Sequence, residues 1–275
     1  MKIKSALYIA FAVGAMTFAS CDQVDMPDRY VDVDNPASPG DSLPITRSLL
    51  VEEFSGQMCV NCPAGSEALE KMQEVNGGPD KVVVVSIHAG QNMGLAIGVG
   101  NGGLATDFGE QLFSRYGLNS EPNAIFDRTS GILSQNNWLT AIVSGLRRES
   151  TVALTARPSY SEADRKLTVE VLARATADYT GNVHVWLTED SIVTMQLLPT
   201  GPVGNHLFNN IFRASATPID GVPVTIGKGA DEKVVYTAEI TLAEGWQPRN
   251  MSVVAFVDNA SGVMQTVRAD VLPAE

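Results

Sequence analysis

The hydrophobic period of the chain changes near Ser150, and this change constrains the fold more than any other sequence feature. Before it, short apolar runs alternate with segments whose apolar residues recur at helical spacing. Strands are expected at 48–54, 81–87 and 123–128, and helices at 64–75, 106–116 and 137–148. Because such alternation is typical of a mostly parallel sheet covered by helices, residues 47–150 are predicted to form an α/β domain.

Beyond Ser150, apolar residues alternate with polar ones, which is the period of half-buried strands. Seven short strands are expected, at 151–156, 166–173, 182–188, 206–213, 233–242, 251–257 and 263–271. Polar turns separate these strands, and no segment between them has a convincing helical pattern. Residues 151–275 are therefore predicted to form an antiparallel β-sandwich of the immunoglobulin-like type.

The N-terminus has the composition of a bacterial export signal. Two lysines precede an apolar run over residues 6–18, and small residues follow immediately before Cys21. The run is too short to span a bilayer comfortably, so residues 1–20 are predicted to be a cleaved signal peptide. Residues 18–21, Phe-Ala-Ser-Cys, resemble the lipobox of bacterial lipoproteins, which implies that Cys21 is acylated and anchors the protein to a membrane. Ordinary secretion, with Cys21 an incidental thiol, is the alternative.

Residues 21–46 form an acidic, proline-containing segment with few large apolar side chains, and we expect a flexible tether. The acidity directly after the cysteine resembles the sorting signals of lipoproteins in Bacteroides-type bacteria, which implies placement at the outer membrane or the cell surface. A solvated linker without sorting function is the alternative. The whole chain has 31 acidic and 19 basic residues and a net charge of −12, so nucleic acid is excluded as an expected partner.

Cys59 and Cys62 have a specific chemical interpretation. They are the cysteines that remain once Cys21 carries lipid, and an oxidising exported compartment permits them to form a disulfide. Cys59 is expected where a helix begins, so that unpaired amides and the helix dipole make its thiolate the attacking nucleophile. Cys62, one turn later, would resolve a mixed disulfide. The alternative is a permanent disulfide, although closing so short a loop contributes only about 2 kcal/mol.

Residues 49–148 resemble thioredoxin-like proteins. The strand followed by the cysteine pair resembles the family's strand-to-active-site step, and Pro122 resembles the proline that the family holds in cis opposite the disulfide. The resemblance implies that Glu121 and Pro122 help to bind an extended substrate segment. The chain departs from the family pattern around the cysteines, where no basic residue lies within several positions. Glu52 and Glu53 lie upstream, and carboxylates near the cysteines would oppose thiolate formation.

No metal site and no cofactor are predicted. The histidines, His88, His184 and His206, lie in separate segments without paired spacing, so the cysteines lack the further ligands that zinc needs. His88 ends the expected central strand, where open α/β sheets bind ligands, but a hydrogen bond to a loop carbonyl is the simpler interpretation. Asp127 and Arg128 are expected to form a polar strand end.

The stretches 53–65, 87–90 and 122–128 together resemble a more specific family, the lipoproteins named after a twenty-eight-kilodalton outer-membrane protein of Bacteroides-type bacteria. The resemblance implies a lipid anchor, a thioredoxin-like domain and a β-sandwich at the outer membrane, facing the periplasm or the cell surface. One expected function is thiol-disulfide exchange with protein thiols of the envelope. Another is a non-enzymatic surface binding protein or adhesin that uses the thioredoxin fold as a scaffold. A third is an accessory subunit of an envelope assembly, because sandwich edges can pair with partners.

Overall fold

The computed structural model describes residues 45–90, 93–94 and 102–273. The predicted signal peptide, Cys21 and nearly all of the tether lie outside the described residues. Within the described ranges, no helix is both long enough and apolar enough to cross a membrane. The described elements belong to one compact unit.

The described residues form both helices and strands. The α-helices are α1 (Cys62–Val75), α2 (Asp107–Tyr116) and α3 (Trp138–Leu146), and two short 3-10 helices are η2 (Gln135–Asn137) and η3 (Pro248–Asn250). The first strands are β1 (Leu49–Ser55), β2 (Val82–His88), β3 (Asn123–Phe126), β4 (Val152–Ser161), β5 (Lys166–Ala175) and β6 (Tyr179–Glu189). The later strands are β7 (Ile192–Leu198), β8 (Gly201–Phe208), β9 (Ile211–Ser215), β10 (Val222–Ile226), β11 (Gly229–Thr241), β12 (Met251–Asn259) and β13 (Gly262–Asp270).

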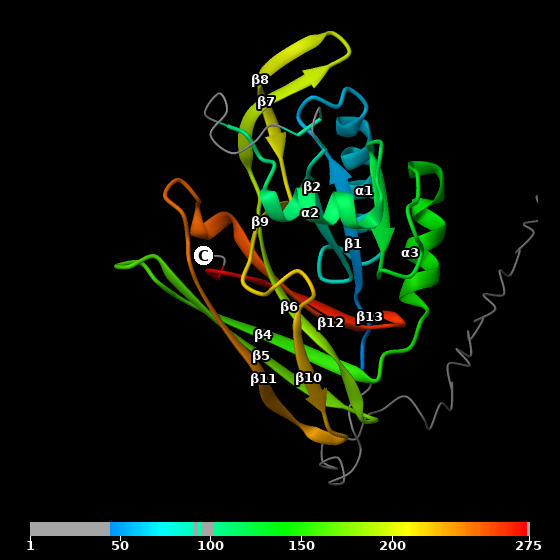
Figure 1. The fold of residues 1–275 in the computed structure, drawn as a ribbon, viewed down its shortest axis with the longest axis vertical. Coiled ribbons are helices and arrows are strands. Elements are labelled where there is room, and N and C mark those ends of the chain that lie inside the picture. The colour runs from blue at the N-terminus through cyan, green and yellow to red at the C-terminus, as the bar shows by residue number, and fades with distance from the viewer. Residues whose placement is uncertain (1–44, 91–92, 95–101, 274–275) are drawn as a thin grey trace, which may run out of the picture. The chain divides into compact units, whose positions relative to one another are not determined.

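A large sheet runs through the molecule in the order β13-β12-β6-β9-β2-β1-β3, and β10 also pairs with β6 (Figure 1). β1 and β2 are parallel, and β3 is antiparallel to β1. Every residue of β1 and β2 is buried because helices cover both faces. Leu49 and Val51 pack toward α1 and α3, whereas Leu50 and Phe54 pack toward α2. Helices therefore cover both faces of β1 and β2.

Two β layers pack face to face in the second part of the chain. A separate sheet in the order β11-β5-β4 packs against β6, β10 and β12, and the side chains between the layers form a continuous apolar core. The expected strand at 206–213 is two strands, because the chain turns between β8 and β9. Asn210 adopts a left-handed φ of 57° there, and its N–H donates to Asp190 Oδ1 at 2.6 Å. β7 and β10 lie outside the ranges expected from the sequence.

The parts before and after Ser150 share the large sheet. The strand pairing at the junction is short, because β2 and β9 pair only through Ser86 and Ile211. The Ser86 N–H donates to the carbonyl of Asn210 at 2.8 Å. The sequence predicted separate domains on either side of Ser150, but strand pairing across this position joins them into one compact unit.

Candidate functional site

Cys59 and Cys62 form a disulfide at the start of α1. The helix begins at Cys62, so Cys59 lies in the preceding turn, where its N–H donates to the carbonyl of Gly56 at 3.1 Å. Pro63 is compatible with the first turn because the donor that it lacks would have no partner within the helix. Both cysteines are buried, with 4% and 1% of their surface exposed.

The segment before β3 lies against the start of α1. The peptide bond between Glu121 and Pro122 is cis, as predicted from the sequence. A Cβ atom added to Gly65 of α1 would lie 2.9 Å from Cγ of Pro122, which is closer than ordinary van der Waals contact. Gly65 therefore allows the helix and Pro122 to approach each other, so the predicted site residues come together.

The side chain of Glu121 lies beside the disulfide. One of its carboxylate oxygens and the Sγ atoms of Cys59 and Cys62 all lie within 4.8 Å of one another. Both oxygens of Glu121 are buried, and neither has a hydrogen-bond partner among the described residues. Burial, reinforced by the nearby carboxyls of Glu110 and Glu53, raises the pKa of Glu121 to about 9. The carboxyl therefore holds its proton at neutral pH.

Glu53 is a second buried carboxyl near the site. It lies on β1 and accepts a hydrogen bond from Ser66 Oγ of α1 at 2.7 Å. Burial raises the pKa of Glu53, although hydrogen bonds from Ser66 and Ser86 act in the opposite direction. Glu53 was expected as an acidic neighbour of the cysteines, whereas only substrate contact was predicted for Glu121. Which way the Glu121 side chain points could not be predicted, because that depends on the fold of the segment before Pro122.

The β7–β8 hairpin is attached to the turn that carries Cys59. Gln196 of β7 donates from Nε2 to the carbonyl of Cys59 at 2.9 Å. The Leu197 N–H donates to the carbonyl of Gln57 at 2.8 Å, and Gln57 Nε2 donates to the carbonyl of Met195 at 2.9 Å. Both glutamine side chains are buried. These contacts hold the turn in place from a hairpin that the sequence analysis did not anticipate.

His88 lies at the end of β2, as predicted, and its side chain is buried. Its Nδ1 has no hydrogen-bond partner among the described residues, and its ring packs edge-on against Phe208 at a centroid distance of 5.4 Å. Burial, together with His206, lowers the pKa of His88 to about 3. His88 is therefore a neutral core residue.

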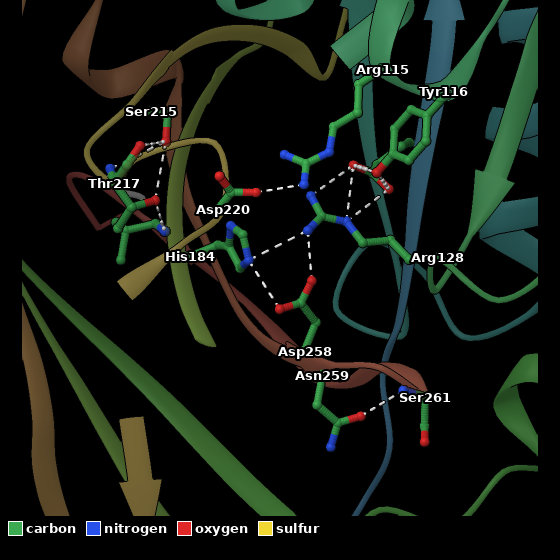
Figure 2. Close-up of polar contacts among 12 residues, drawn as sticks. Arg115, Tyr116, Arg128, His184, Ser215, Thr217, Asp220, Asp258, Asn259 and Ser261 are labelled. Atoms are coloured by element: carbon green, nitrogen blue, oxygen red, sulfur yellow. Dashed lines mark hydrogen bonds and ion pairs between the residues drawn. The ribbon is translucent and has the colours of Figure 1, made fainter. Parts of the chain in front are cut away.

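Arg128 is the centre of a buried charged cluster away from the disulfide (Figure 2). Its guanidinium donates to Glu52 Oε1 at 3.0 Å and to Asp258 Oδ2 at 2.7 Å. The same group lies 4.8 Å from the ring centroid of Phe256. His184 Nε2 lies 3.1 Å from the other carboxylate oxygen of Asp258. This cluster connects β1, β6 and β12 to the segment after β3.

Asp127 has a second set of buried polar contacts. Asp127 pairs with Arg47 and accepts a hydrogen bond from the Leu50 N–H at 3.0 Å. Asp127 and Arg128 have left-handed φ values of 49° and 58°, which turn the chain sharply after β3. Asp127 and Arg128 follow β3 directly, where a polar strand end was predicted, and both form ion pairs, Asp127 as a fully buried and Arg128 as a largely buried side chain.

Comparison with known proteins defines the class of protein. The family model described as outer membrane protein Omp28 matches residues 109–274, which is more than half of the chain. The chain belongs to this family, which confirms the predicted family resemblance and the outer-membrane location. The matched range begins after Cys62, so it does not include the disulfide. No curated protein matches the chain.

Two solved structures are similar to the chain. HBP35 of Porphyromonas gingivalis has a TM-score of 0.64 and 14% identity, and the match covers 82% of this chain and 76% of that chain. A domain of the outer membrane lipoprotein Omp28 from the same organism has a TM-score of 0.32 and 18% identity, covering 46% of this chain and 92% of that one. At these identities, the first match supports a shared fold.

Proposed function

We propose that this outer-membrane protein carries out thiol-disulfide exchange with other envelope proteins through Cys59 and Cys62. The observation that carries the proposal is the arrangement of the disulfide, at the start of α1 and opposite Pro122, with a Glu121 carboxyl beside the sulfurs that has no hydrogen-bond partner in the part of the chain that the structure describes. An unpaired buried polar group is costly, and such groups cluster at functional sites. The disulfide is thus placed where chemistry is expected.

The topology supports a thioredoxin-like assignment for residues 47–150. β1, α1 and β2 form a parallel unit, β3 returns antiparallel to β1, and α3 shares a face of the sheet with α1. The two β layers of residues 151–275 support an immunoglobulin-like sandwich, which we propose as a scaffold for partner contacts.

The exchange transfers two electrons between the cysteine pair and the thiols of a partner protein. A thiolate of a partner protein attacks Sγ of Cys59 and breaks the Cys59–Cys62 bond. Cys62 leaves as a thiolate and takes up a proton. A second partner thiolate then attacks the mixed disulfide, so that the partner becomes a disulfide and this protein a dithiol. In the opposite direction, Cys59 attacks a partner disulfide and Cys62 resolves the intermediate.

The reduction potential of the cysteine pair is expected between about −120 and −270 mV, the range of catalytic dithiols. It is measured by equilibrating the protein in thiol buffers and trapping free thiols for mass spectrometry. Cys62→Ser should accumulate a mixed disulfide on Cys59, and the matched variant Cys59→Ser should accumulate far less. A potential below about −300 mV, or a pair inert to glutathione, would contradict turnover.

The proposal includes a lipid anchor on Cys21, in the part of the chain that the structure does not describe. Cys21→Ser is expected to abolish incorporation of labelled fatty acid and to release the protein from the membrane fraction, since no helix in the described ranges could hold it there. Cys62→Ser is the matched control and should keep the label. Retention of label in Cys21→Ser would contradict the anchor.

A non-enzymatic binding protein is the second candidate function. It is supported by the burial of both sulfurs and by a cavity of about 340 Å³ beside α1, whose lining includes Glu53, Glu70 and His206. That volume falls within the range of about 300 to 1,000 Å³ for ligand pockets. An inert disulfide in the experiment above would favour this function, and protease accessibility on intact cells would show whether the domain faces outward.

A further inference from the structure

The side chain of Glu121 gives the cysteine pair a third potential ligand that the sequence analysis did not identify. We propose that reduction of the Cys59–Cys62 disulfide creates a binding site for a borderline-soft divalent cation such as Zn²⁺, with Cys59, Cys62 and Glu121 as ligands. This inference does not require thiol-disulfide exchange, because it concerns the reduced state however that state is reached.

The geometry of the three side chains fits one ion. Zn²⁺ binds thiolate sulfur at about 2.3 Å and carboxylate oxygen at about 2.0–2.2 Å, so ligand atoms around one ion lie about 4 Å apart. The Sγ atoms and one oxygen of Glu121 already lie within 4.8 Å of one another. Once the bond between the sulfurs is broken, small side-chain movements suffice to place three ligands around a shared ion.

The surroundings of Glu121 favour a cation. Its carboxyl oxygens have no hydrogen-bond partner among the described residues, so an ion would satisfy them. The charged groups that act on this carboxyl are Glu110 of α2 and Glu53 of β1, and both are acidic. A cation bound to Glu121 would therefore offset the repulsion that its ionised carboxylate meets from these two acids.

The ligand set indicates which metals the site would take. Two thiolates and one carboxylate suit Zn²⁺, whereas Mg²⁺ and Ca²⁺ require oxygen ligands. Three protein ligands leave one position of a tetrahedral ion open for water or for a group from a partner, as in catalytic zinc sites. The site is thus closer in composition to an exchangeable metal site than to a closed structural one.

Formation of the metal site from the disulfide consumes two electrons and releases protons when the metal binds. A dithiol or phosphine reductant supplies two electrons to the disulfide and is itself oxidised, and Cys59 and Cys62 become thiols. The metal then displaces the thiol protons and the proton of Glu121, and these protons are released to solvent. Oxidation of the thiols by a disulfide would reverse the process and release the ion.

Cobalt titration of the mature full chain in detergent tests the proposal. After reduction with a phosphine, Co²⁺ is expected to bind at one equivalent, with thiolate-to-cobalt charge transfer and the intense d–d bands of a tetrahedral site. Zn²⁺ should displace it and abolish these bands. Glu121→Gln should weaken cobalt binding by at least about tenfold. Glu110→Gln is the matched control, which removes a nearby acid that is not a ligand, and should bind nearly as tightly as the wild type.

The oxidised protein provides the reference for the same titration. Equal cobalt binding by oxidised and reduced protein would overturn the proposal, and so would a Glu121→Gln variant that binds like the wild type. Circular dichroism of each variant confirms that it is folded before titration. A disulfide too stable for exchange would refute turnover, but phosphine would still reduce it, so the two proposals fail separately.

Discussion

Arg128→Met is expected to lower the free energy of unfolding by about 3–5 kcal/mol, because removing one partner of a buried ion pair leaves an uncompensated charge. The carboxylate of Glu52 is fully buried and that of Asp258 is largely buried, and both lose their cation in this variant. Methionine keeps much of the side-chain volume, so the loss of unfolding free energy reflects the missing charge and not an empty cavity. Urea unfolding followed by circular dichroism measures the difference.

Arg115→Met provides the matched control for this experiment. Arg115 pairs with Asp220 in the same region, but its side chain is 49% exposed and that of Asp220 is 72% exposed (Figure 2). Solvent screens such a pair, so the control is expected to cost less than about 1 kcal/mol. Equal destabilisation by the two substitutions would show that the buried cluster does not stabilise the fold in the way described.

Asp127→Asn is expected to destabilise the protein by about 3–5 kcal/mol as well, because it leaves the buried guanidinium of Arg47 without a counter-charge. Asparagine tolerates the left-handed φ of this position, and its amide oxygen can still accept from the Leu50 N–H. The substitution therefore removes the negative charge of Asp127 while keeping the backbone conformation and the hydrogen bond from Leu50. Chemical denaturation gives the free-energy difference.

Arg148→Met tests whether the second arginine near Asp127 contributes. Its guanidinium lies 3.5 Å from Asp127 Oδ2 and is partly exposed. We expect a loss below about 1 kcal/mol. If Asp127→Asn costs no more than Arg148→Met, the pairing of Asp127 with Arg47 is not a major source of stability.

Local sequence signals predicted the elements around the disulfide. The run of valines in β2 and the helical spacing in α1 are strong patterns, and they gave the correct element types with end positions that differ by a few residues. The cis bond before Pro122 and the pairing of Cys59 with Cys62 were predicted because each depends on a short motif. β7 was missed because its one buried residue is the polar Gln196, while its apolar residues are exposed or only partly buried.

Contacts between distant parts of the chain could not be predicted from these patterns. Arg128 is 76 residues from Glu52 and 130 residues from Asp258, and no local spacing indicates such partners. The hydrogen bond from Gln196 to Cys59 joins residues 137 positions apart. The position of the Glu121 carboxyl likewise depends on how the segment before β3 is placed beside α1. The composition of the candidate metal site therefore emerges only in the folded chain.

Hydrogen bonds from Arg47 attach the start of the folded unit to β13, its last strand. Arg47 lies two residues before the start of β1, and its side chain donates to the carbonyls of Val263 and Met264, which are 216 and 217 residues away. The ends of the folded unit are thus fastened to each other. Contacts between residues so far apart in sequence form slowly, and these contacts cannot form until β13 is present. During export, the segment that leads into the disulfide therefore acquires its final contacts only after nearly the whole chain has crossed the inner membrane.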